Sequence, residues 1–123
     1  MVGYVTLGTN DMERAARFYD ELLESLGAKR LMDLPEGFIL WGTSFETACI
    51  ALARPFDQQP ATVGNGVMVA LQADSKEAVA ALHAKALELG GTDEGAPGPR
   101  GEGFYAAYFR DLEGNKLNAF VLG

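Results

Sequence analysis

The stretch GNGVMVALQADS, residues 64–75, decides the fold because its construction occurs a second time at the N-terminus. It combines a loop, a strand of β-branched and apolar residues, and a helix start at its last two residues. Residues 3–11, GYVTLGTND, have the same order, with Tyr4 at the position of Met68.

The correspondence continues at a constant offset through the strand, the helix and the turn after it. Asp11 falls on Ser75, Phe18 on Leu82, Gly27-Ala28 on Gly91-Thr92, and Trp41 on Tyr105. A register kept over this length indicates an internal duplication, so the chain consists of one module repeated.

The first copy predicts one strand, one helix and three further strands. Its helix is capped by Thr9 or Asn10 and ends at Gly27. The strands are expected at residues 3–8, 29–32, 38–42 and 47–53, and the apolar stripe of the helix comprises Ala15, Phe18, Leu22 and Leu26.

The second copy predicts the same series, with a helix at 75–89 and strands at 66–72, 104–110 and 116–121. Between the helix and the second strand, residues 95–103 are rich in glycine and proline, which predicts a loop and a candidate cavity lid. Arg100 in this loop could bind an anion, or it could be an ordinary solvated arginine.

Two such copies predict an α+β fold, with two βαβββ modules in tandem forming a curved mixed sheet around a cleft. The 123 residues suffice for a single domain. We expect module 1 over about residues 1–54, a linker over about 55–65, and module 2 over about 66–123.

The composition excludes several classes of partner. The hydrophobic share of 48% and the charged share of 22% are ordinary for a globular protein. Ten basic and seventeen acidic residues give a net charge of −7, which argues against nucleic acid and anionic membranes and permits a cationic ligand. No apolar run is long enough to cross a bilayer, so the cytoplasm is the expected location.

Two further residue types are interpreted as structural. Cys49 lies in an apolar run and is expected to be a buried thiol. His83, the only histidine, shares a helical face with apolar residues and is expected to be a satisfied core or surface histidine, the alternative being a general base.

At this point the chain resembles the vicinal oxygen chelate superfamily, which includes glyoxalases, extradiol dioxygenases and bleomycin-resistance proteins. The resemblance rests on the paired modules, on YVTL at 4–7 before NDMERA at 10–15, on Phe18-Tyr19, and on RDLEGNK at 110–116. It implies a homodimer and a cleft that takes a small organic molecule.

The resemblance also implies four positions at which many members bind a divalent metal. They correspond to Tyr4, a residue near Cys49 or Ile50, Met68 and Asn118. Phenol, thioether and amide groups do not supply the imidazole, thiolate or carboxylate ligands that such metals need. We therefore expect no metal and no other cofactor.

Five residues are candidates for contacting a ligand. Tyr4, Met68 and Asn118 are expected to line the cleft, the alternative being inward packing. Trp41 and Tyr105, which the repeat pairs, could stack on a planar or cationic ligand or could be core aromatics.

Three functions follow from these observations. The first is a glyoxalase/bleomycin-resistance-like protein that binds a small organic molecule in its cleft without the usual metal. The second is a lyase or dioxygenase-type enzyme with atypical ligands or metal-free acid–base chemistry, using Tyr4, Tyr105 or a carboxylate. The third is an accessory domain with a vestigial cleft. Whether the protein is an enzyme is left open by the sequence.

Overall fold

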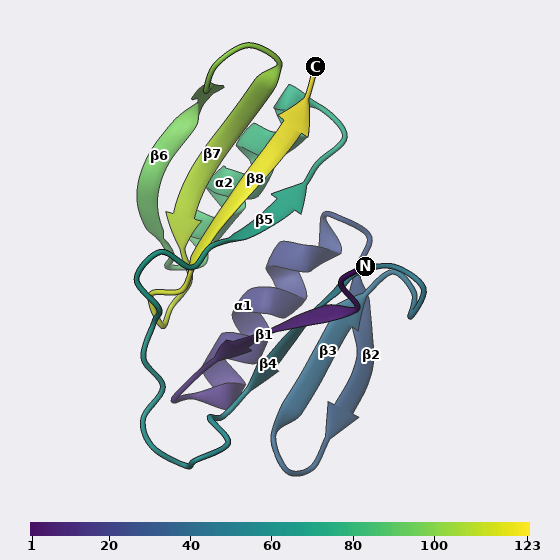
Figure 1. Ribbon diagram of the computed structural model, residues 1–123, viewed down its shortest axis with the longest axis vertical. Coiled ribbons are helices and arrows are strands. Elements are labelled where there is room, and N and C mark those ends of the chain that lie inside the picture. The colour runs from purple at the N-terminus through teal and green to yellow at the C-terminus, as the bar shows by residue number, and fades with distance from the viewer. The chain divides into compact units, whose positions relative to one another are not determined.

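The computed structural model describes residues 1–123, which divide into two compact units, Met1–Val63 and Gly64–Gly123 (Figure 1). Each unit is a βαβββ module, as the repeat predicts. The first contains β1 (Tyr4–Gly8), α1 (Met12–Glu24), β2 (Lys29–Leu34), β3 (Phe38–Gly42) and β4 (Cys49–Ala53). The second contains β5 (Val69–Gln72), α2 (Lys76–Glu88), β6 (Thr92–Pro99), β7 (Phe104–Arg110) and β8 (Lys116–Leu122).

Each module forms its own four-stranded mixed sheet, in the orders β1-β4-β3-β2 and β5-β8-β7-β6. The first and last strands of a module pair in parallel, and the other neighbours pair antiparallel. The predicted α+β class with tandem βαβββ modules is confirmed. That the modules form a single domain joined by a linker at 55–65 stays a prediction.

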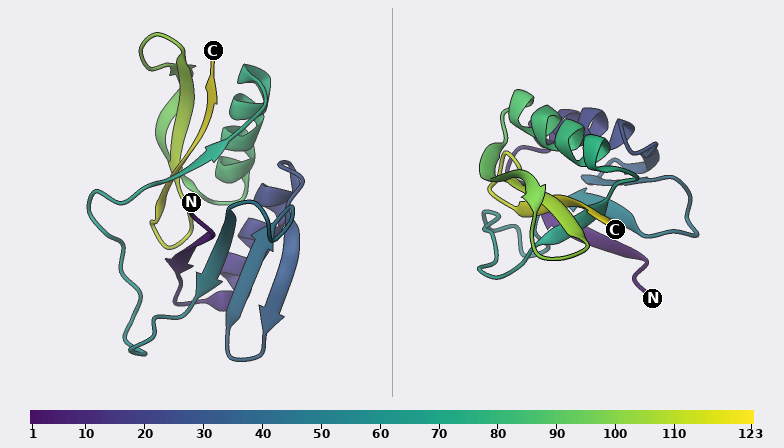
Figure 2. Two further views of the ribbon diagram at one scale, coloured as in Figure 1. Left: turned by 45° about the vertical axis from the view of Figure 1, so that its right-hand side comes forward. Right: turned by 90° about the horizontal axis from the view of Figure 1, so that it is seen from above.

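The helix of each module packs along one face of its own sheet, and we call the opposite face the open face (Figure 2). Because successive side chains of a strand point to opposite faces, each strand contributes every second residue to the helix side. In the second module this side is filled by Val79, Leu82 and Ala86 of α2 and by Phe109 and Leu117 of the sheet, all fully buried.

The helix starts differ from expectation at the first module. Asp11 is the N-cap of α1, because its Oδ1 atom accepts a hydrogen bond from the backbone N–H of Arg14 at 3.1 Å. Thr9 instead accepts from the backbone N–H of Asp11, and the side chain of Asn10 binds the backbone of Ala61. In the second module Ser75, one of the two residues at which the sequence predicts the helix start, caps α2.

The prediction of a loop over 95–103 is wrong for its first half. Residues 95–99 belong to β6, which pairs with β7 through two shifts of register. The shifts let the strand accommodate glycines and prolines that a regular strand disfavours. Only the turn at 100–103 is irregular, and Gly101 and Gly103 adopt positive φ angles there.

On the helix side of the first module, three polar side chains form a network. The carboxylate of Asp20 on α1 accepts hydrogen bonds from Nε and Nη2 of Arg30, at 2.8 and 2.7 Å, and from Nε1 of Trp41 at 2.9 Å. The hydrogen bonds from Arg30 are the main reason that the pKa of Asp20 lies below its usual value of 3.8, and the one from Trp41 lowers it further.

This network predicts a dependence of stability on pH. A carboxyl group whose pKa is lower in the folded state stabilises the fold above pH 3.8, and the contribution disappears as the pH falls below 3.8 toward the folded pKa. Asp20→Asn is expected to cost about 1 kcal/mol near neutral pH, because the pair is partly exposed. In urea unfolding, the difference from the unmodified protein should narrow as the pH falls below 3.8.

The matched control for this prediction is Asp33→Asn. Asp33 also binds Arg30, at 2.8 Å, but its side chain is more exposed than that of Asp20. Its replacement should change stability little at any pH. A stability difference for Asp20→Asn that is the same at pH 3 and pH 7 would contradict the assignment.

Candidate functional site

The open face of the first module carries aromatic and small apolar side chains. The pairing of Tyr4 with Cys49, and of Thr6 with Ala51, places these four residues on one face. The ring of Tyr4 lies edge-on to that of Phe38, with centroids 6.1 Å apart, so Phe38 belongs to the same face. Tyr4 remains 56% exposed, and its phenol is therefore accessible.

The open face of the second module contains the one buried polar atom that lacks a partner. Asn118 on β8 pairs with Ala70 of β5 on one side and with Tyr108 of β7 on the other. It is 1% exposed, and its Oδ1 atom has no hydrogen-bond partner. Met68 directly precedes β5, is 40% exposed, and shares this face with Ala70 by strand alternation.

Trp41 and Tyr105 both lie on the helix sides of their sheets, so neither lines an open face. The repeat correspondence between them is wrong by four residues, because Trp41 pairs with Ile50 as Phe109 pairs with Leu117, which makes Phe109 the counterpart of Trp41. Trp41 is 1% exposed and packs against Tyr19 of α1 with ring centroids 5.7 Å apart. Tyr105 lies beneath the first residue of α2, with Nζ of Lys76 at 5.5 Å from its ring centroid. Trp41 therefore matches the alternative of a core aromatic, whereas Tyr105 is half-buried at the helix side.

His83 and Cys49 are also engaged in the fold. His83 is buried on the helix side, and its Nε2 lies 3.0 Å from Oδ1 of Asp93. The thiol of Cys49 is buried and donates toward the backbone carbonyls of Thr47 and Ser44, at 3.3 and 3.4 Å. Because both side chains are buried, neither residue provides an accessible base or nucleophile.

The register identifies the fourth position at which the resemblance implies a metal ligand. Thr6 pairs with Ala51 just as its repeat counterpart Ala70 pairs with Asn118. The counterpart of Asn118 is therefore Ala51, which lies next to the expected neighbourhood of Cys49 and Ile50. Insertions between β2 and β4 hide this register in the sequence.

The residues present do not fit a divalent metal. An alanine has no donor atom, and the phenol, thioether and amide at the other three positions are poor ligands for zinc, nickel or iron. Within either module, no three His, Cys, Asp or Glu side chains come together to hold an ion.

Three residues lie near Asn118, of which Arg100 was considered from the sequence as a residue that could bind an anion, and Tyr108 and Lys116 were not. The ring of Tyr108 has Cζ of Arg100 at 5.3 Å and Nζ of Lys116 at 5.5 Å from its centroid. Lys116 lies two residues before Asn118 on β8, so both face the same side of the sheet. The sequence signal for this cluster is the pair of glycines, Gly95 and Gly98, shortly before Arg100.

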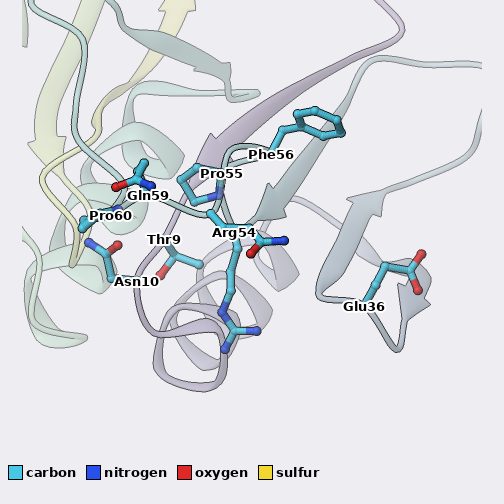
Figure 3. Close-up of a pocket in the computed structure, with 9 residues that line it drawn as sticks. Thr9, Asn10, Glu36, Arg54, Pro55, Phe56, Gln59 and Pro60 are labelled. Carbon is cyan, nitrogen blue, oxygen red and sulfur yellow. The ribbon is translucent and has the colours of Figure 1, made fainter.

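A separate hollow of about 730 Å³ lies in the first module (Figure 3). In this view Arg54 extends between Thr9 and Asn10 on one side and the turn that carries Glu36 on the other. The remaining lining residues are Pro55, Phe56, Gln58, Gln59 and Pro60. Most of these side chains are exposed and none is an unsatisfied buried group, so we regard the open faces as the stronger candidate site.

Comparisons with known proteins identify the family to which this fold belongs. A sequence model of the Glyoxalase/Bleomycin resistance protein/Dioxygenase superfamily matches residues 1–119. Among solved structures, a glyoxalase/bleomycin resistance protein from Albidiferax ferrireducens is 36% identical, with a TM-score of 0.88, covering 98% of this chain and 97% of that one. A search of curated protein sequences found no match.

Two more distant structures share the fold. A glyoxalase/bleomycin resistance protein/dioxygenase family enzyme from Burkholderia phytofirmans is 24% identical, with a TM-score of 0.79 and 98% of both chains covered. TnmS3, an antibiotic binding protein from a Streptomyces species, is 22% identical, with a TM-score of 0.70, covering 100% of this chain and 96% of that one. Neither helix of the present chain has the length and apolar character needed to span a membrane.

Proposed function

Because the chain belongs to the Glyoxalase/Bleomycin resistance protein/Dioxygenase superfamily, we propose that it binds a small organic molecule on the open faces of its sheets, without a divalent metal. The observation that carries this proposal is the buried, unpartnered Oδ1 atom of Asn118. A homodimer and a cytoplasmic location stay predictions.

The energetics of Asn118 support a ligand. Leaving a buried acceptor unsatisfied costs about 1–3 kcal/mol, and native proteins rarely retain such atoms without a reason. A ligand that donates an N–H or O–H group to Oδ1 would remove this cost. The exposed side chain of Met68 offers apolar contact area on the same face as Asn118. Tyr4 offers an aromatic ring on the open face of the first module.

Binding is favoured over catalysis by the placement of the tyrosines. Of the two phenols considered as acid–base groups, Tyr105 lies on the helix side and only Tyr4 lies on an open face. Acid–base catalysis needs a group within hydrogen-bond reach of the substrate, commonly supported by a second group. No hydrogen bond to another side chain supports Tyr4, whose ring packs edge-on against that of Phe38.

Asn118→Leu tests the proposal, because leucine has the branched shape of asparagine without its polar atoms. We expect the variant to be more stable than the unmodified protein by about 1 kcal/mol, since the unsatisfied acceptor is removed. It should also lose binding of any probe that the unmodified protein binds. Urea unfolding measures the first effect, and calorimetric titration with bleomycin, catechol and a glutathione–methylglyoxal adduct measures the second.

The stability control is Gln72→Leu, which removes an exposed amide from the neighbouring strand β5 and should change stability by less than about 0.5 kcal/mol. If the unmodified protein binds none of the probes, and no small molecule from a chemically diverse library, the proposed function is wrong. If Asn118→Leu bound a probe as tightly as the unmodified protein does, Asn118 would not be part of the ligand-binding site.

A further inference from the structure

The side chain of Arg100 is held over β6 by three backbone carbonyls. Its Nη2 donates to the carbonyl of Ala96 at 2.6 Å, and its Nη1 donates to those of Gly98 at 2.9 Å and Pro99 at 3.5 Å. Since a guanidinium has five N–H donors, these three bonds leave the other donors for a ligand.

Two glycines make the space in which this guanidinium lies. A Cβ atom at Gly95 would stand 3.1 Å from Nη2 of Arg100 and 3.2 Å from the ring of Tyr108. A Cβ atom at Gly98 would stand 3.2 Å from Nη1. All three distances are shorter than ordinary van der Waals contacts, so an alanine at either position would force the neighbouring group to shift by a few tenths of an ångström.

Arg100 and Lys116 flank one aromatic ring and have no carboxylate partner. Both cations lie within 5.5 Å of the ring centroid of Tyr108, and neither takes part in a salt bridge. The carboxylates of β6 are engaged elsewhere: Asp93 by His83 on the helix side, and Glu94 by Arg110 at 2.9 Å. The local charge around Tyr108 is therefore positive, although the whole chain carries −7.

The unsatisfied acceptor lies beside this positive cluster. Asn118 pairs directly with Tyr108 and is two residues from Lys116 on the same strand. Paired residues on neighbouring strands have Cβ atoms about 5 Å apart, which a small planar molecule can span. The cluster therefore offers two cations, an aromatic ring and one acceptor on a single face.

We propose that Arg100, Lys116, Tyr108 and Asn118 form a recognition site for a small carboxylate that also carries a hydrogen-bond donor. This proposal rests on the proposed function and specifies its ligand as an anion. The net charge of the whole chain, taken alone, would instead permit a cationic ligand. Arg100 and Lys116 hold the carboxylate, Tyr108 provides the surface beneath it, and Asn118 accepts the N–H or O–H group.

The test uses three probes of nearly equal size: benzoate, 3-hydroxybenzoate and the cation benzamidine. They are titrated into the isotopically labelled protein at low salt and followed by the amide resonances of Gly95 and Gly98 and by the side-chain amide of Asn118. We expect saturable shifts with benzoate, tighter binding of 3-hydroxybenzoate because it adds a donor, and no local shifts with benzamidine. Added salt should weaken the binding of both anions.

Variants separate this site from a general attraction of anions. Arg100→Gln should weaken benzoate binding about tenfold, since it removes charge-assisted hydrogen bonds. Gly95→Ala keeps the charge and shifts the guanidinium only slightly, and it should weaken binding less than Arg100→Gln does. The control is Arg17→Gln on α1. It removes an exposed arginine that belongs to the first module and is paired with Glu13, and it should leave benzoate binding unchanged.

Three results would overturn the proposed carboxylate site. Benzamidine could bind more tightly than benzoate, or the unmodified protein and Arg100→Gln could bind benzoate equally well. In the third case, neither benzoate nor 3-hydroxybenzoate binds at millimolar concentration. In each of these cases a ligand of another class, found by the library search and lost in Asn118→Leu, would leave the proposed function intact.

Discussion

Replacing Trp41 with alanine is expected to lower the free energy of unfolding by about 3–5 kcal/mol, the largest effect of any single change considered for this protein. Trp41 is the only tryptophan and is one of the largest fully buried side chains. Its removal leaves a cavity between β3 and α1, exposes the ring of Tyr19, and takes a donor away from Asp20.

Trp41→Phe separates packing from hydrogen bonding. Phenylalanine keeps much of the buried ring but cannot donate to Oδ1 of Asp20, so we expect a loss of about 1–2 kcal/mol. Because both variants lack the only fluorescent indole, circular dichroism is the suitable probe of their urea unfolding.

The control is Phe56→Ala, since Phe56 is 102% exposed. Removing it should change stability by less than about 0.5 kcal/mol. If Trp41→Ala cost no more than this control, Trp41 would not be a core residue, and its role as a stacking surface for a ligand would have to be reconsidered.

Asp111→Ala is expected to cost about 3 kcal/mol, because one buried carboxylate organises the turn between β7 and β8. Its Oδ1 atom accepts from the backbone N–H groups of Glu113 and Asn115, both at 2.9 Å, and its Oδ2 atom accepts from the side chain of Asn115 at 2.9 Å. Gly114 completes the turn with a φ of 97°, which other residues rarely adopt.

Asp111→Asn should recover only part of this loss. One oxygen remains to accept backbone hydrogen bonds, but the new amide would face the amide of Asn115 as a second donor. Asp57→Ala is the matched control, because the exposed Asp57 accepts a single backbone hydrogen bond, from Gln59 at 3.0 Å. Urea unfolding of the three variants should give the order Asp57→Ala, Asp111→Asn, Asp111→Ala in increasing loss, and any other order would contradict this account of the turn.

The duplication, and with it the architecture, could be predicted from the sequence. Strand and helix periodicity are local properties, and the constant offset that links Tyr4 to Met68 and Phe18 to Leu82 exposes the repeat without any knowledge of contacts. The cap at Ser75 was predictable for the same reason. The cap at Asp11 was not, because Thr9 and Asn10 are equally good caps and their side chains are used by other contacts.

Which residues lie on the open faces could be learned only from the tertiary structure. Which face of a strand meets the helix is set by pairing and packing between segments far apart in the chain, and this places Trp41 and Tyr105 away from the open faces. The same pairing aligns Ala51 with Asn118.

By itself, the sequence determined two βαβββ modules and the absence of strong metal ligands at the positions it could align. Only the folded chain decided that Asn118 is buried without a partner, and that Arg100 lies over two glycines beside Tyr108. The physical reason is that solvent exclusion and hydrogen-bond satisfaction are properties of all surrounding atoms together, and these atoms come from strands that meet only when the sheet forms.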